Sequence, residues 1–265
     1  CYSRVVAQSN VAITKFNCIN DAVEPWQTML RTHFKIKGRN VDTLLFADDQ
    51  IVIAETEDNL QRAIHQLSNI TSEYNLQISY EKTKIMAFRG TDHLRAKIYI
   101  NNNPIQQQSD FNYLGYIVSY TSNRDVQNKL NKFQTICGTI KRTFKNCNRQ
   151  TLLKLYKIMA IPTLLYGCES WVLTISQQNK VEAAEMRFLR QVAGYRLIDK
   201  KRNVDIRREL GIQSLNETII AYRQKWQDHV QRMNEDRTPQ IVHKYKPVGR
   251  RNVGRPRMRW SDQFP

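Results

Sequence analysis

The feature that most constrains the fold is a change of hydrophobic period between Ser119 and Arg124. Before it, short apolar runs rich in β-branched residues alternate with turn residues and one helical stretch. After it, apolar residues recur every three or four positions. The first pattern is typical of strands packed with a helix, and the second of a helical bundle. The sequence therefore predicts an α+β fold whose second part is all α, with a domain boundary near Ser119–Arg124.

Two short apolar runs, Thr43–Ala47 and Gln50–Ala54, flank the adjacent acids Asp48 and Asp49. Two such runs joined by two turn-prone residues predict a β-hairpin. A helix follows from Thr56 to Tyr74, with Thr56 as its N-cap and two acids at its positive end. Further strand-like runs are Leu76–Tyr80, Lys84–Phe88, Lys97–Ile100 and Phe111–Ser119.

In the second part, helical spacing predicts several amphipathic helices. The first carries Val126, Leu130, Phe133 and Cys137 on one side, and the next carries Leu152, Leu155, Tyr156 and Met159 before Pro162. Two further helices are expected over Gln177–Ala193 and Leu215–Met233. We expect Trp171 and Trp226 to be core residues rather than platforms for nucleic-acid bases.

The net charge of +17 is distributed unevenly. Residues 1–123 carry 12 basic and 12 acidic side chains, whereas residues 124–265 carry 29 basic and 12 acidic ones. A cationic surface of this size favours a polyanion, most often a nucleic acid. The alternative is a solvated basic face. From Lys246 to Arg259, six of fourteen residues are basic and none is acidic, which predicts a flexible basic arm.

Several classes of protein are disfavoured. The apolar runs fall short of the roughly 18 residues of a membrane-spanning helix, and we expect no membrane partner. The five cysteines and five histidines lack metal-ligand spacing, so a zinc site is not expected. Reduced thiols predict an intracellular protein, in the nucleus or the cytoplasm. The first residue is Cys rather than Met, which indicates a fragment or a processed product.

The adjacent acids Asp48 and Asp49 carry the sharpest chemical signal. Two neighbouring carboxylates raise each other's pKa, and a divalent cation removes that penalty. Hard oxygen ligands with open positions suit Mg²⁺, and a two-metal site stabilises in-line phosphoryl displacement. The alternative is an ordinary solvent-exposed hairpin turn, where Asp is common.

Taken together, several motifs resemble the reverse transcriptases of non-LTR (LINE-type) retrotransposons. Phe46-Ala47-Asp48-Asp49 resembles their catalytic hairpin, and Leu76–Lys84 resembles the next palm motif. Phe111–Gly115 resembles the primer grip. The segments Tyr166–Trp171 and Gly254–Trp260 resemble thumb and C-terminal segments of the insect-type elements. The order of the motifs matches the family over roughly residues 19 to 260.

The resemblance implies a partial polymerase palm, with an antiparallel hairpin, strands and a packed helix, followed by an all-α thumb and a flexible basic tail. Residues 1–40 would end the fingers and early palm, 41–122 complete the palm, 123–235 form the thumb or connector, and 236–265 form the tail. Asp48 and Asp49 would be metal-binding carboxylates for two Mg²⁺ ions. Lys82 would assist the leaving pyrophosphate, and Leu114 and Gly115 would lie under the primer 3′ end.

The resemblance also implies binding of an RNA template, a DNA primer and deoxynucleotide triphosphates. The grip on nucleic acid would be electrostatic and would not read bases. Candidate phosphate contacts are Lys129, Lys132, Lys141, Arg142 and Lys145 along one long helix, and Arg250, Arg251, Arg255, Arg257 and Arg259 in the tail.

Two departures from the family pattern bear on activity. Ser79 stands where the family has Asn, and the family's first catalytic Asp has no match, since Asp21 and Asp42 lie in a different context. A metal site short of one carboxylate binds its ions poorly. We therefore expect a polymerase fragment that is inactive by itself. One alternative is a non-catalytic nucleic-acid-binding remnant, and another is a basic helical protein with an accidental Asp-Asp turn.

Overall fold

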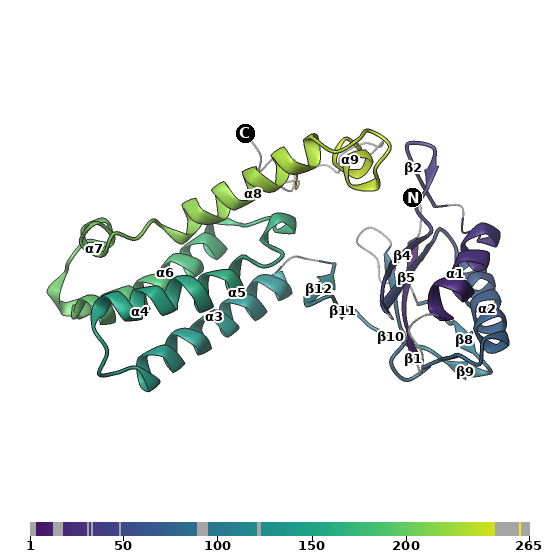
Figure 1. Cartoon of the computed structure of the whole chain (residues 1–265), viewed down its shortest axis with the longest axis horizontal. Coiled ribbons are helices and arrows are strands. Elements are labelled where there is room, and N and C mark those ends of the chain that lie inside the picture. Colours follow the sequence, from purple (N-terminus) through teal and green to yellow (C-terminus); the bar gives the residue numbers. More distant parts are fainter. Residues whose placement is uncertain are drawn as a thin grey trace. The chain divides into compact units, whose positions relative to one another are not determined.

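A computed structural model describes residues 4–12, 18–30, 32, 34–47, 49–88, 95–120, 123–246 and 260 (Figure 1). The chain divides into two compact units. Unit 1 comprises Cys1–Tyr120 and Asn234–Pro247, and unit 2 comprises Thr121–Met233 and Val248–Pro265. The change at Tyr120 falls where the hydrophobic period of the sequence changes.

Unit 1 mixes strands and helices, as the α+β expectation requires. Its helices are α1 (Cys18–Met29), α2 (Glu57–Glu73) and α9 (Thr238–His243). Its strands are β1 (Arg4–Ala12), β2 (Lys35–Ile36), β3 (Arg39–Asn40), β4 (Thr43–Phe46), β5 (Asp49–Ala54), β6 (Gln77–Ile78), β7 (Lys84–Phe88), β8 (Tyr99–Ile100), β9 (Asn103–Pro104), β10 (Gln106–Gln107), β11 (Asp110–Tyr113) and β12 (Tyr116–Ser119).

The main sheet of unit 1 has the strand order β10-β7-β1-β5-β4, with β6 also paired to β1. The pairs β4–β5, β5–β1 and β1–β7 are antiparallel, and β10 runs parallel to β7. The predicted hairpin is the β4–β5 pair. Strand β1 lies between β5 and β7, so it is the central strand beside this hairpin.

Helices α1 and α2 cover one face of the sheet (Figure 1). Helix α2 begins where the sequence predicts, because the Thr56 hydroxyl accepts the Asn59 N–H. Alternate residues of β5 and β7 enter the core under these helices, among them Val52, Ala54 and Ile85. Strand periodicity thereby fixes which side chains are left for the opposite face.

The opposite face packs against the hairpin β11–β12. Ile51 of β5 and Met86 of β7 form a second apolar cluster with Phe111, and Tyr113 lies against it. The sequence predicted a single strand-like run over Phe111–Ser119, and this was wrong. The chain reverses at Leu114-Gly115, because Tyr113 pairs with Tyr116 and both turn residues have positive φ.

Unit 2 is helical. It contains α3 (Asn123–Thr143), α4 (Arg149–Leu155), a π-helical turn (Tyr156–Ala160), α5 (Ile161–Leu165), a 3₁₀ turn (Cys168–Ser170), α6 (Ile175–Ala193), a second 3₁₀ turn (Leu197–Asp199), α7 (Asn203–Leu210) and α8 (Leu215–Gln231). Its core includes Phe133, Tyr156 and Phe188, with the rings of Tyr156 and Phe188 stacked at 5.1 Å between centroids.

The predicted stripe through Leu152 and Tyr156 is confirmed only in part. Tyr156 is fully buried, but Met159 is 44% exposed, and the helical path continues past Pro162. The cause is the π turn, where Ile161 donates its N–H to the Tyr156 carbonyl, five residues back. This wider turn rotates Met159 out of the stripe and precedes the proline, which has no N–H to donate.

The segment after α8 belongs to unit 1. Helix α9 forms at Thr238–His243, within the range that the sequence assigned to a basic tail. The Arg39 guanidinium donates to the Asp236 carbonyl, and Gln240 and Ile241 are buried. In the described part of the chain, no helix has the length and apolar character that crossing a membrane requires.

Candidate active site and nucleic-acid interface

The β4–β5 hairpin carries the candidate active site. Phe46 pairs with Asp49, so the chain reverses between these two residues, one position earlier than the sequence predicted. Ala47 has φ +53°, a left-handed conformation typical of tight hairpin turns, and Asp49 is already part of β5. Asp48 lies outside the described residues, so its role stays a prediction.

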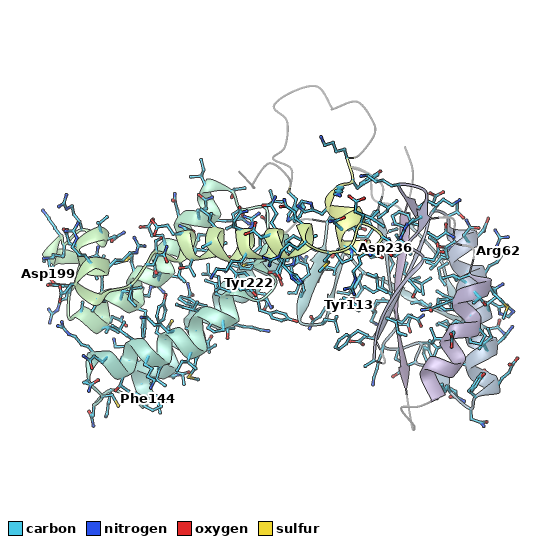
Figure 2. All side chains as sticks on the ribbon, turned by 45° about the horizontal axis from the view of Figure 1, so that its top comes forward. Arg62, Tyr113, Phe144, Asp199, Tyr222 and Asp236 are labelled. Atoms are coloured by element: carbon cyan, nitrogen blue, oxygen red, sulfur yellow. The ribbon has the colours of Figure 1, made fainter. Side chains whose placement is uncertain are left out.

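Asp49 shares a sheet face with Ile51, away from α1 and α2, because side chains alternate along β5. The same face carries Tyr113, labelled in Figure 2. Burial raises the pKa of the Tyr113 phenol, and the negative charge of Asp49 raises it further. The Asp49 carboxylate thus lies close enough to the β11–β12 hairpin to act electrostatically on Tyr113.

Strand β1 lies beside the candidate catalytic strand. In its register, Ser9 is opposite Gln50 and Asn10 is opposite Asp49. The strand runs Arg4–Ala12 and contains neither Asp nor Glu. The strand adjacent to Asp49 therefore supplies no carboxylate.

The turn between β11 and β12 contains both candidate primer-grip residues. Leu114 has φ +49° and Gly115 has φ +76°, which is the pattern of a type I′ turn. Glycine adopts this conformation freely, whereas a branched residue such as leucine is strained there. Leu114 keeps 36% of its surface exposed. An exposed apolar side chain in strained backbone at a hairpin tip is a common mark of a functional contact.

Lys82 lies on the surface, in the turn that precedes β7. This turn is closed by Thr83, whose N–H and hydroxyl both donate to the Ser79 carbonyl. Ser79 therefore contributes its backbone to the turn. The role of Lys82 near an incoming nucleotide stays a prediction.

The residues present suit a magnesium site only in part. Among the described residues, no group of three His, Cys, Asp or Glu side chains is arranged to hold a metal ion. Asp42 instead accepts a hydrogen bond from the Thr32 hydroxyl. Asp48 and Asp49 provide hard oxygen ligands of the kind Mg²⁺ prefers. Two carboxylates alone, however, supply too few protein ligands for two Mg²⁺ ions.

The candidate phosphate contacts do not form one stripe along α3. Lys129 is 4% exposed, its ammonium lies 4.7 Å from the Tyr166 ring centroid, and burial lowers its pKa. Lys132 and Lys141 are exposed but nine positions apart, which places them on opposite sides of a helix. Arg142 is exposed near the end of α3, and Lys145 follows that end.

Lys129 is therefore not one of the exposed phosphate contacts that the sequence predicted, because its ammonium group is desolvated and lies against the Tyr166 ring. The tail candidates Arg250, Arg251, Arg255, Arg257 and Arg259 lie outside the described residues. Trp171 is fully buried, as predicted. Trp226 is half-buried, with its ring edge-on to Trp260.

Sequence reasoning did not assign a role to two features. Tyr113 faces the same side as Asp49, and the signal was the period-2 alternation from Phe111. The basic segment between α6 and α7 was also missed, because it follows a strong amphipathic helix and has no period of its own.

Comparison with known proteins identifies the first part of the chain. The model of the family "Reverse transcriptase (RNA-dependent DNA polymerase)" matches residues 13–118. These residues are similar to that family and make up less than half of the chain. This match contains the β4–β5 hairpin, the α2 helix and all of the β11–β12 hairpin except its last residue, Ser119.

Two relatives extend the similarity into unit 2. A transposon-derived protein of Caenorhabditis elegans is 24% identical over 242 residues, which cover 87% of this chain and 86% of the relative. A Drosophila melanogaster protein named "Probable RNA-directed DNA polymerase from transposon X-element" is 21% identical over 224 residues. That alignment covers 80% of this chain but only 24% of the relative. The resemblance to non-LTR retrotransposon reverse transcriptases is confirmed.

Proposed function

We propose that this chain is the later palm and the thumb of an RNA-directed DNA polymerase, and that it binds an RNA template paired with a DNA primer. Unit 1 would be the palm and unit 2 the thumb. Asp48 and Asp49 would hold two Mg²⁺ ions in a complete enzyme, where the metal ions would polarise the phosphoryl group of the incoming nucleotide.

The observation that carries this proposal is the shared face of Asp49, Ile51 and the β11–β12 hairpin. A polymerase needs its metal ligands and the surface that supports the primer 3′ end on the same side of the sheet. Tyr113 responds electrostatically to Asp49, which brings the Leu114-Gly115 turn to that side. In this arrangement Leu114 supports the primer terminus.

We further propose that the chain does not catalyse nucleotide addition by itself. The support is the composition of β1, which lies next to the hairpin and places Asn10 opposite Asp49. Asn is a neutral ligand and does not replace the charge of a carboxylate. The same observation favours the second candidate function, a non-catalytic protein that keeps the fold and the grip on nucleic acid.

Binding and extension are tested separately, with the full chain and a labelled oligo(dT) primer on poly(rA). We expect the primer–template duplex to bind with an affinity that falls steeply with salt. We expect no extension above that of an Asp49→Asn variant. An affinity that is flat from low to high salt would refute the phosphate grip.

Extension by the wild-type chain would overturn the proposed inactivity. If the Asp49→Asn variant then loses extension, the metal assignment stands; if it extends equally well, that assignment is wrong. An Asn10→Asp variant adds a carboxylate at the register position opposite Asp49. The proposal expects this variant to bind Mg²⁺ more tightly than the wild type does.

A further inference from the structure

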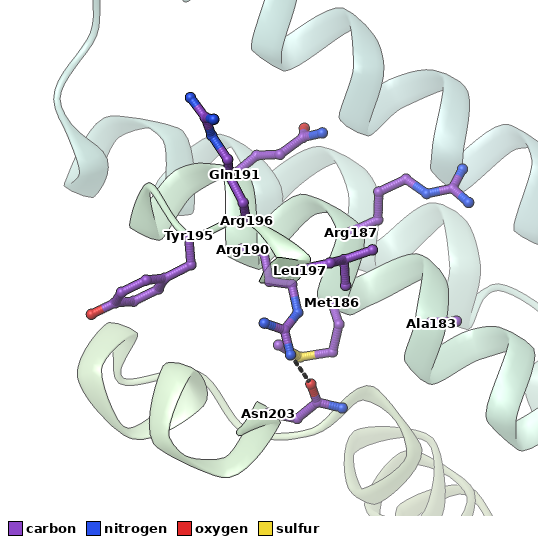
Figure 3. A pocket seen from close by; sticks show the side chains of 9 residues that line it. All are labelled: Ala183, Met186, Arg187, Arg190, Gln191, Tyr195, Arg196, Leu197 and Asn203. Carbon is purple, nitrogen blue, oxygen red and sulfur yellow. Dashed lines mark hydrogen bonds between the residues drawn. The ribbon is translucent and has the colours of Figure 1, made fainter. Parts of the chain in front are cut away.

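A pocket of about 540 Å³ lies in unit 2 between α6, α7 and the segment that joins them (Figure 3). Arg187, Arg190 and Arg196 line it, and none of its lining residues is acidic. Met186, Leu197 and Ala183 add an apolar wall. The volume is within the range of about 300–1,000 Å³ of small-ligand sites, and the mixture suits a ligand with an anionic and an apolar part.

Arg190 is held in place from one side only. Its Nη2 donates to the Asn203 side-chain oxygen at 2.7 Å and to the Lys201 carbonyl at 2.9 Å. Its Nη1 is buried and has no hydrogen-bond partner among the described residues. A buried guanidinium donor without an acceptor is costly, and an anionic ligand oxygen would satisfy it.

Second contacts fix the position of Arg190. The Asn203 amide nitrogen donates to the Glu182 carboxylate at 3.1 Å, which orients the amide oxygen toward Arg190. Figure 3 shows the Arg190 guanidinium between Met186 and Asn203, with Arg187 and Arg196 extending outward in different directions. A fixed donor inside a pocket with exposed cations at its rim is suited to phosphate recognition.

Two further features favour an anionic polymer as the ligand. Helix α7 begins at Asn203, a pocket residue, without a side-chain cap hydrogen bond, and Asp205 in its first turn offsets only part of its positive dipole end. The segment Arg187–Arg208 contains eight basic and two acidic residues. Leu197 and Ile198 beside it are 81% and 80% exposed. Exposed apolar groups among cations offer contacts to both the bases and the phosphates of a single strand, although these groups are aliphatic and not stacking rings.

We propose that this pocket binds one nucleotide of a single-stranded nucleic acid, with a phosphate at Arg190 and the base against Met186 and Leu197. The proposal rests on the proposed function, because it assigns to unit 2 a second contact for the unpaired strand. Paired bases in a duplex are not available to the apolar wall, so the pocket prefers single strands.

The test uses the full chain and fluorescein-labelled ten-nucleotide oligouridylate, its thymidylate equivalent and a primer–template duplex. The double variant Arg187→Gln, Arg196→Gln removes the rim charges, and both side chains are outward-pointing. Its matched control, Lys157→Gln with Arg232→Gln, removes two exposed charges of unit 2 that do not line the pocket. A Leu197→Ser variant tests the apolar wall.

We expect the rim variant to weaken oligonucleotide binding about tenfold more than its control, since it removes phosphate contacts rather than general charge. Leu197→Ser should weaken it by a smaller factor at unchanged salt dependence. A 4-thiouridine oligonucleotide should crosslink within Met186–Asn203.

Equal losses in the rim variant and its control overturn the pocket, as does a crosslink that maps elsewhere. Binding of inorganic phosphate without oligonucleotide binding also overturns it. These results leave the proposed function intact if the wild-type chain still binds the duplex with steep salt dependence. Loss of salt-dependent binding to every nucleic acid would instead refute the proposed function itself.

Discussion

The buried ion pair between Glu185 and Arg207 supports the surface that carries the α6–α7 pocket. Glu185 is fully buried, its carboxylate lies 2.6 Å from Arg207 Nη2, and it accepts the Leu215 N–H at 3.2 Å. Glu182 contacts the same guanidinium at 3.3 Å but is 36% exposed. The two glutamates therefore offer a matched comparison of a buried and a half-exposed contact to one arginine.

We predict that Glu185→Gln lowers the free energy of unfolding of unit 2 by about 3 kcal/mol, the lower end of the cost of breaking a buried pair, because Glu182 still neutralises part of the Arg207 charge. Glu182→Gln should cost less than about 1 kcal/mol, since solvent screens its contact. Urea unfolding measures both, followed by tryptophan fluorescence, because three of the four tryptophans lie in unit 2.

A double-mutant cycle completes this experiment. The double variant Glu185→Leu, Arg207→Met removes both charges and keeps apolar volume. Its loss of unfolding free energy should therefore be smaller, by at least about 1.5 kcal/mol, than the summed losses of Glu185→Leu alone and Arg207→Met alone. The reasoning is refuted if Glu185→Gln and Glu182→Gln cost the same within error. It is also refuted if the two single substitutions of the cycle are additive.

Three further predictions concern the turn, the core and the thiols. Leu114→Asn should slow amide exchange in β11–β12, because Asn adopts left-handed φ at lower cost. The same variant should bind the duplex more weakly. Faster exchange would contradict the inference that the Leu114 backbone is strained. Asp125→Ala should destabilise unit 2 by about 2 kcal/mol, because it leaves the buried Trp171 indole N–H, now 2.7 Å from the carboxylate, without an acceptor; calorimetry measures the loss. Burial raises the pKa of Cys137 to about 12, so at pH 8 maleimide should label the exposed Cys147 far faster, as peptide mapping by mass spectrometry would show.

Local rules predicted the elements whose stability is decided locally. The Thr56 cap and the stripe from Leu60 fixed α2, and β-branched alternation fixed β5 and β7. The predicted turn of the β4–β5 hairpin was one residue too late, and the turn at Leu114 was not predicted at all. Cross-strand pairing rather than turn propensity sets where a hairpin reverses. Sequence alone gives no register, so the position of Asn10 opposite Asp49 was also beyond it.

The candidate site was predictable as a motif but not as a surface. The family resemblance identified Asp49 and Leu114 separately, whereas the sheet face that joins them follows only from tertiary packing on Ile51. Helix α3 shows the opposite limitation. Its helical period was evident, yet Lys129 is buried because Asp125 and the Tyr166 ring lie beside its ammonium group.

Net charge overstates how many cations of unit 2 can contact phosphate. Residues 121–233 carry 21 basic and 9 acidic side chains, but Lys129 and Arg223 are buried and Arg207 is held by two glutamates. The overall excess of basic over acidic side chains still sets the long-range field that attracts a polyanion. The buried and paired cations do not release counterions at the interface, because they cannot approach a phosphate. The salt dependence of duplex binding should therefore report fewer contacts than the charge predicts, and the difference measures how much of the basic excess maintains the fold.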